Sequence, residues 1–331
     1  MQYRKTFIYL LSLMLLFTIV FAKPSKIEAG FADNYNSLYY DLSRLVYQAN
    51  DTTASKQSIQ DAINATHGKG KFKVIEAVNV NKYAYHQMSQ VGTGYGTSTS
   101  RHALDQTGFK AMAVVAEGSG KLFIAFSGTN SGSVTDVNTA RATLSVKEPG
   151  QAYQAQLFAN FIYKKYTNYR GYKWYLTGHS LGGWLATNLY LDIRSATWLI
   201  PTDYKFKYGG PVGKKTISGV YTFNPLPMGK NQIPDVQWKA NKDGLYNTDV
   251  KNLYINNEWL NGVYDMNTSQ MDYIGTKGSI NNENILHYSR LNYTPKGPLL
   301  DLAGYHLQAM TAQKDINAAH SLSRLGKYVG N

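Results

Sequence analysis

Apolar residues in the first third of the chain follow two different periods. Between residues 33 and 67 they recur every three to four positions, which predicts helical structure with a second helix at 58–65. Residues 71–80 alternate between apolar and polar side chains, as a half-buried strand does. The apolar face of the first helical stretch comprises Tyr35, Leu38, Tyr39, Leu42, Leu45 and Val46.

The middle of the chain alternates between short apolar runs and longer helical stretches. The segment Gly118-Ser119-Gly120 joins two of these runs and predicts a hairpin. Residues 150–168 and the residues from Trp184 onward have helical spacing, while 198–219 form a glycine- and lysine-rich insertion. No linker or internal repeat interrupts the pattern, so we expect a single domain over 31–331. The predicted strands are 109–117, 122–126, 173–177, 220–223 and 252–256.

A short motif lies where strand 173–177 meets the helix that begins near Trp184. It reads Gly178-His179-Ser180-Leu181-Gly182-Gly183, and a G-x-S-x-G sequence between a strand and a helix is the nucleophile elbow of serine hydrolases. The glycines allow strand and helix to approach closely, and the sharp turn presents the Ser180 hydroxyl to a substrate. The backbone N–H of Leu181, at the helix start, can then bind a developing oxyanion.

Taken together, these segments resemble the class 3, fungal-type lipase family and its bacterial relatives. The likeness covers roughly residues 105–260. It implies an α/β-hydrolase (lipase-like) fold, with a mostly parallel central sheet flanked by helices, and ester hydrolysis that needs no cofactor and no metal ion. The segments that carry it, in the order of the family, are Leu122–Thr129, Gln154-Ala155, Leu176–Gly183 and Val220-Tyr221-Thr222-Phe223-Asn224-Pro225.

The resemblance also implies that the backbone N–H groups of Thr129 and Leu181 form the oxyanion hole. Elementary geometry agrees, because two donors must converge on one oxygen and one of them must come from a loop opposite the elbow. Thr129 follows strand 122–126 and therefore stands in such a loop.

A serine nucleophile needs a histidine as general base and a carboxylate that orients this histidine. In this fold the serine comes first, then the acid, then the histidine, which leaves His287, His306 and His320 as candidates. The resemblance favours His320, because the family places its base on a late loop before a short terminal stretch. His306 is the main alternative base.

The acid is expected on the loop that follows strand 252–256. Glu258 stands about where the family has its aspartate, and a glutamate can fill this role because only a buried carboxylate is required. Asp265 and Asp249 flank this position and remain alternative acids.

The first 22 residues have the pattern of a secretory signal peptide. Arg4 and Lys5 precede an apolar run over 7–21, and Val20-Phe21-Ala22 offers a cleavage site, with Ala29 as a second one. An uncleaved anchor is the alternative. The chain has no cysteine, which excludes disulfides, thiolate metal sites and a lipoprotein anchor. We therefore expect a secreted protein or one on the extracellular surface.

The charge of the chain adds a candidate partner. Lys and Arg number 34 against 21 Asp and Glu, a formal net charge of +13. Such a protein is attracted to anionic membranes or cell-wall polymers. The lysines are spread along the chain without a nucleic-acid-binding motif, so no nucleic-acid partner is expected.

The sequence thus predicts a secreted serine hydrolase, of lipase, phospholipase or esterase type, that forms an acyl-enzyme on Ser180 and acts on carboxylic esters of lipids. Two alternatives stay open. One is a catalytically inactive surface-binding protein with the same fold, and the other is an acyltransferase or amidase that acts on cell-wall material. The sequence does not predict the oligomeric state or the acyl chain length.

Overall fold

The computed structural model describes residues 36–50, 52–79, 109–128, 150–197, 217–255 and 271–280. By backbone contacts the chain divides into two units, 1–33 and 34–331, and every described residue belongs to the second. The predicted signal segment 1–22 and most of the predicted insertion 198–219 lie outside the described residues.

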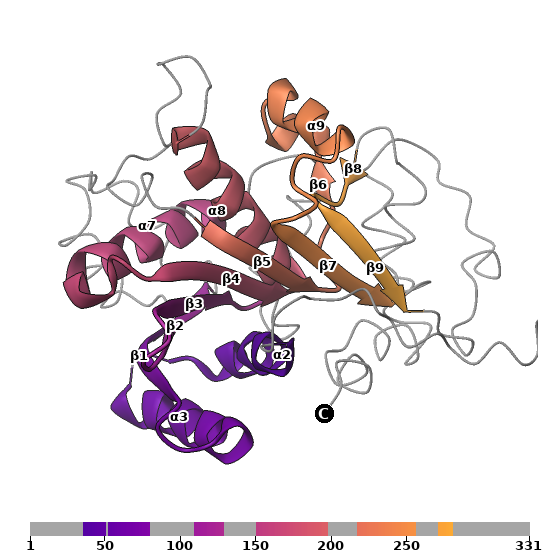
Figure 1. The fold of residues 1–331 in the computed structure, drawn as a ribbon. Helices are drawn as coiled ribbons and strands as arrows, with labels where there is room; N and C mark the ends of the chain where they lie inside the picture. Colours follow the sequence, from indigo (N-terminus) through magenta and orange to yellow (C-terminus); the bar gives the residue numbers. More distant parts are fainter. Residues whose placement is uncertain are drawn as a thin grey trace, which may run out of the picture. The chain divides into compact units, whose positions relative to one another are not determined.

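A seven-stranded sheet organises the described part of the second unit (Figure 1). Strands β1, β2 and β3 pair antiparallel, and β3, β4, β5, β7 and β9 pair parallel in that order. The predicted mostly parallel sheet with flanking helices is thereby confirmed. The strands are β1 (Phe72–Asn79), β2 (Lys110–Ala116), β3 (Lys121–Phe126), β4 (Lys173–His179), β5 (Ile217–Phe223), β7 (Val250–Ile255) and β9 (Thr276–Ile280).

Helices cover both faces of this sheet (Figure 1). Helix α2 (Asn36–Leu45) packs on β3, β4 and β5 from one side, and α3 (Thr53–His67) packs on β1. Helix α8 (Leu181–Thr197) packs on β3, β4 and β5 from the other side, with α7 (Gly150–Lys165) beside it. Because side chains alternate between the faces, Leu122 and Leu176 belong to the cluster around α7 and α8, whereas Phe123 and Tyr175 pack toward Tyr39 of α2.

The helical stretch predicted over 33–67 is divided in two. A single 3-10 turn, η1 (Val46–Gln48), follows α2, and the chain then turns before α3 begins at Thr53. The Thr52 side chain caps α3 by accepting a hydrogen bond from the Ser55 N–H at 3.1 Å. The predicted helix over 58–65 is therefore the central part of α3.

The structure also contains elements that the sequence analysis did not predict. Strand β5 starts at Ile217, so the last residues of the predicted insertion belong to the sheet. The second half also contains the short antiparallel pair β6 (Met228–Gly229) and β8 (Met271–Asp272), 3-10 turns η2 (Thr167–Tyr169) and η4 (Lys230–Gln232), and α9 (Asp235–Lys242). Within the described ranges, no helix has both the length and the apolar character that a membrane crossing requires.

A buried carboxylate joins α7 to α8. Asp192 of α8 is 8% exposed and accepts hydrogen bonds from the side-chain amides of Gln156, on α7, and Asn188. Burial raises the pKa of the Asp192 carboxyl to about 7, against the opposing effect of the Gln156 hydrogen bond. The Gln156 Oε1 atom is buried without a hydrogen-bond partner in the described part of the chain.

The substitution Asp192→Asn should stabilise the protein at neutral and alkaline pH. Because the folded-state pKa is raised, the folded protein keeps a proton between about pH 4 and pH 7 that the unfolded chain has lost, and stability falls as pH rises through this window. An asparagine has no such penalty, and its side-chain oxygen can accept the hydrogen bonds that Gln156 and Asn188 donate. We expect the free energy of unfolding at pH 8 to increase by about 2 kcal/mol, with little change at pH 4.

Chemical denaturation at both pH values measures this difference. The exposed Asp61, which accepts a hydrogen bond from Gln57, provides the control Asp61→Asn, which removes the same charge at a solvent-exposed site. An equal effect of Asp192→Asn at pH 4 and pH 8 would contradict the assignment.

Candidate active site

Ser180 stands in the turn that leads from β4 into α8. Its φ angle is +57°, a left-handed conformation that non-glycine residues rarely adopt. Backbone hydrogen bonds hold the turn: the Ser180 N–H donates to Phe223 O at 3.1 Å, and the Ser180 carbonyl accepts from the N–H groups of Gly183 and Leu226. The strained conformation is therefore imposed by β5 and α8, as observed at functional turns.

Glycines make this turn possible because backbone occupies the space of their absent side chains. A Cβ on Gly182 would lie 2.1 Å from Phe126 O, and a Cβ on Gly178 would lie 2.3 Å from Gly182 C. The first turn of α8 thus rests directly on the carboxyl ends of β3 and β4. Any side chain at these positions would push the helix away from the sheet.

The end of β3 closes over Ser180. A Cβ on Gly128 would lie 2.9 Å from Ser180 Cβ and 2.5 Å from His179 O, so the Gly128 backbone lies against the elbow. The residue after Gly128 is Thr129, the predicted oxyanion donor, which lies outside the described residues. Leu181, the other predicted donor, is the first residue of α8, where a backbone N–H has no acceptor within the helix.

A residue that the sequence analysis did not single out connects these parts. The Tyr47 hydroxyl accepts a hydrogen bond from the Gly128 N–H at 3.0 Å and lies 2.9 Å from His179 Nδ1. A hydroxyl can donate one hydrogen bond and accept two, so Tyr47 bridges Gly128 and His179 with either tautomer of the histidine. Nothing in the helical pattern distinguishes Tyr47 from its neighbours, since its role depends on contacts with residues more than eighty positions away.

The segment that carries Tyr47 is fixed to the strands below the elbow. Ser43 Oγ of α2 lies 2.9 Å from Thr177 Oγ1 of β4, and Thr177 Oγ1 donates to Tyr221 O of β5 at 2.6 Å. Both hydroxyl-bearing side chains are buried. This network joins α2 to the two strands that position Ser180 and thereby fixes the position of Tyr47, two residues beyond α2.

Asp249, one of the alternative acids, lies at the other end of the sheet. It directly precedes β7, and its carbonyl accepts a hydrogen bond from the Val220 N–H of β5. Along β5, Val220 lies about four residues, or roughly 13 Å, from the level of Ser180. Its carboxylate accepts hydrogen bonds from Tyr190 Oη at 2.7 Å and from Arg194. The structure therefore does not bring Asp249 to Ser180.

The other predicted site residues are not described by the structure. Glu258, Asp265, His287, His306 and His320 all lie outside the described ranges. Within those ranges, no group of three or more His, Asp or Glu side chains could hold a metal ion.

Comparison with known structures gives fungal lipases at low similarity. The native Rhizomucor miehei lipase propeptide complex is 15% identical over 74% of this chain and 67% of that chain, with a TM-score of 0.42. Lipase II from Rhizopus niveus is 13% identical over 76% and 82%, and nonglycosylated LIP2 lipase of Yarrowia lipolytica is 14% identical over 75% and 79%, each with a TM-score of 0.44.

Comparisons at the level of sequence find nothing. No protein-family model matches the chain, and no curated protein matches it. At these identities and TM-scores the assignment of the fold rests on the strand order and the flanking helices themselves.

The close contact between α8 and β3 predicts a large loss of stability for Gly182→Ala. A methyl group there would meet the Phe126 carbonyl at 2.1 Å, and because the obstacle is backbone, the helix itself must move. We expect the free energy of unfolding to fall by about 3 kcal/mol or more.

The matched control is Gly171→Ala, because a Cβ at Gly171 meets no heavy atom within 4 Å and its φ is not positive. Thermal unfolding of the two variants compares them directly. Similar melting temperatures for both would argue against the close packing of α8 on β3.

Proposed function

We propose that this protein is a serine hydrolase of lipase type that cleaves carboxylic esters of lipids through an acyl-enzyme on Ser180. The observation that supports this most is the left-handed Ser180 at the β4–α8 turn, with the Gly128 backbone packed against its Cβ. That arrangement supports the proposal, because acyl transfer requires a nucleophile close to backbone segments that can supply N–H donors. The same residues would serve esters of various acyl chain lengths.

In the proposed mechanism, Ser180 Oγ attacks the ester carbonyl and gives up its proton to His320. The N–H groups of Leu181 and Thr129 bind the resulting oxyanion, and Glu258 orients the histidine. The C–O bond then breaks, and the alcohol leaves with the proton from His320. Water attacks the acyl-enzyme in the same way, which releases the acid and restores Ser180. His306 remains the alternative base and Asp265 the alternative acid.

The preference for lipid esters rests on two features of the sequence. Residues 1–22 have the pattern of an export signal, and a net charge of +13 attracts a protein to anionic surfaces. An exported, basic hydrolase meets phospholipids and glycerides at such surfaces. The proposal therefore includes secretion and a lipid or ester substrate, without a cofactor.

Tyr47 takes the role of a positioning residue in this proposal. Its hydroxyl accepts a hydrogen bond from the Gly128 N–H at 3.0 Å and thus holds the peptide unit that precedes Gly128. Gly128 leads directly into Thr129. An oxyanion hole works because its donors are held in place before the charge develops. Loss of the hydroxyl leaves the Gly128 N–H without this acceptor and loosens the loop next to Ser180.

Labelling with a fluorophosphonate probe tests the proposed function. The probe reacts only with an activated serine, so the wild-type protein should become covalently labelled, and the Ser180→Ala variant should not. Ester hydrolysis should fall by a factor of about 10⁴ or more in the same variant, since the nucleophile is removed. Mass spectrometry of the labelled peptide identifies the modified residue.

Two outcomes would contradict the proposal. If folded wild-type protein stays unlabelled even with detergent or a lipid surface present, the inactive binding protein is the better explanation. If label and activity persist in Ser180→Ala, another residue is the nucleophile. Release of transfer product in excess of free acid would instead favour an acyltransferase.

The substitution Tyr47→Phe tests the positioning role. We expect kcat to fall about tenfold, the cost of leaving one N–H without its partner, while KM changes less than twofold. Binding of a trifluoromethyl ketone, which forms an oxyanion on Ser180, should weaken by the same factor, whereas binding of the product alcohol should not.

Tyr169→Phe is the control, since Tyr169 lies in η2 beyond the far end of α7. A Tyr47→Phe variant with a lower melting temperature but the wild-type kcat would show that Tyr47 has a purely structural role. The Ser180 labelling experiment is independent of this result, so the two failures can be told apart.

A further inference from the structure

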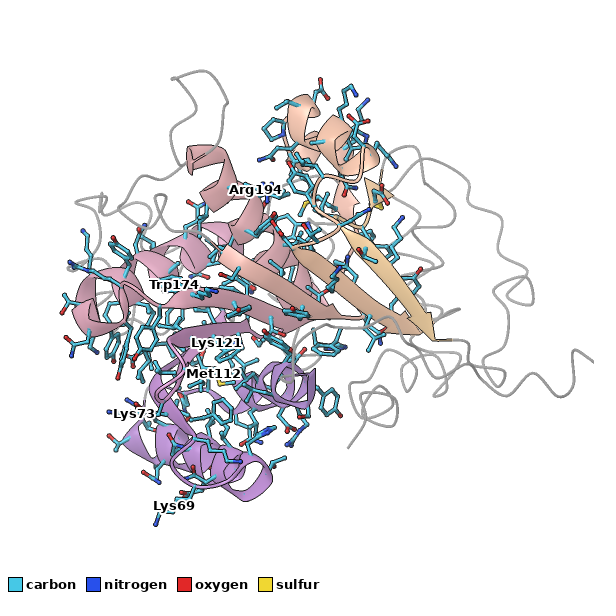
Figure 2. All side chains as sticks on the ribbon, viewed as in Figure 1. Lys69, Lys73, Met112, Lys121, Trp174 and Arg194 are labelled. Atoms are coloured by element: carbon cyan, nitrogen blue, oxygen red, sulfur yellow. The ribbon has the colours of Figure 1, made fainter. Side chains whose placement is uncertain are left out.

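The end of the sheet opposite Ser180 is strongly basic. Residues 52–79, 117–128 and 150–173 contain nine Lys and Arg residues but only three acidic residues, Asp61, Glu76 and Glu117. Figure 2 shows Lys69 and Lys73 at α3 and β1. We call these nine residues the basic face: Lys56, Lys69, Lys71, Lys73, Lys121, Lys164, Lys165, Arg170 and Lys173.

Backbone pairing places the strand ends that carry several of these residues side by side at one end of the sheet. Lys121 and Lys173 are direct partners in the register of β3 and β4, at the start of both strands. The Lys71 carbonyl accepts from the Glu117 N–H at 3.0 Å, which joins the start of β1 to the β2–β3 turn. The face therefore crosses four adjacent strands, a width of roughly 14 Å at 4.8 Å per strand.

A cavity of about 240 Å³ lies within this face, between β1 and the segment that follows α7. Its lining includes Lys56, Lys73 and Lys165 together with Tyr166 and Tyr169. Burial lowers the pKa of Lys56, and the ammonium groups of Lys165 and Lys73 lower it further, although Glu76 opposes them. Three ammonium groups and the one carboxylate of Glu76, which pairs with Lys165, thus meet at the cavity, and the positive charge in excess favours a bound anion.

Local structural roles account for only some of these charges. Lys165 pairs with Glu76 at 2.8 Å, and Lys56 donates to the Ile75 carbonyl. Lys73 lies on β1, an edge strand among the described strands, where lysines discourage pairing with other chains. These roles do not explain the exposed Lys71 and Lys173, which stand at the β1 and β4 ends.

We propose that the basic face binds an extended polyanion that carries closely spaced phosphate groups, with one phosphate seated among Lys56, Lys73 and Lys165. The charge and the width of the face suit several phosphates in a row. Strand β4 has seven residues, so this face lies roughly 23 Å from the level of Ser180. A flat bilayer bound to the basic face would therefore not reach Ser180.

The aromatic residues at the cavity do not form a platform for nucleobases. Tyr166 stacks with Tyr169 at a centroid distance of 6.4 Å, and its hydroxyl donates to Ile75 O and Glu76. Lys165 Nζ lies 5.2 Å from the centre of the Tyr166 ring. With these contacts in place, the face recognises phosphate rather than base, which favours a polymer other than nucleic acid.

Two charge-matched triple variants test the proposal. Lys71→Gln, Lys73→Gln and Lys173→Gln neutralise exposed positions of the basic face. Lys230→Gln, Lys239→Gln and Lys251→Gln remove the same charge from η4, α9 and β7. Binding of long-chain inorganic polyphosphate is measured for the wild type, both triples and Ser180→Ala over a range of salt concentrations.

We expect the basic-face triple to raise the Kd for polyphosphate at least tenfold and to lower the salt dependence of binding by two to three ion equivalents. The control triple should stay within twofold of the wild type, and so should Ser180→Ala, which makes this result independent of the proposed hydrolase activity. Thermal unfolding verifies that all variants are folded.

Several outcomes would overturn the proposal. Equal weakening in both triples would mean that net charge alone drives binding. No binding of the wild type at low salt would exclude the site. Tighter binding of single-stranded DNA with the same number of phosphates would indicate a nucleic-acid surface, and binding of phosphatidylglycerol vesicles but not polyphosphate would indicate a bilayer.

Discussion

The structure around Ser180 depends on the direct contact of backbone with backbone where α8 meets the sheet. Gly178 and Gly182 allow the helix to start within van der Waals distance of β3 and β4, and this closeness forces Ser180 into a left-handed conformation. The strain is offset by the hydrogen bonds from the turn to Phe223 and Leu226. The same geometry brings the end of β3 against the serine, so one constraint positions both the proposed nucleophile and the strand end that leads to the proposed oxyanion donor.

The sequence predicted this part of the molecule well because its signals are local. Parallel strands that are covered on both faces read as continuous apolar runs, which located β3, β4 and β5 to within a few residues. The glycines of the elbow also give a recognisable local spacing, because the close contact between strand and helix requires them at fixed positions. The second helix was predicted over 58–65, and only its earlier start at Thr53 was missed, because Thr52 caps the helix within a stretch whose apolar spacing continues.

Other features depend on contacts that no local pattern contains. Tyr47 reaches the elbow through a hydroxyl, and its position in the sequence resembles that of any tyrosine on an amphipathic helix. Asp249 stayed an alternative to Glu258 in the sequence, and only the strand register places it at the amino end of β7, beside Arg194. The cations of the basic face are scattered over more than a hundred residues, and only the sheet brings them together.

The contacts that complete the elbow also determine when in folding it can form. Ser43 meets Thr177 across 134 residues of chain, and Tyr47 meets His179 across 132. Contacts between such distant residues form slowly, because a long loop must close before they are gained. The contacts of the turn with Phe126 and Phe223 close shorter loops, of 56 and 43 residues, whereas its tie to Tyr47 must wait for α2 to dock. A chain that crosses a membrane unfolded would therefore carry an incomplete elbow until one of its last steps of folding.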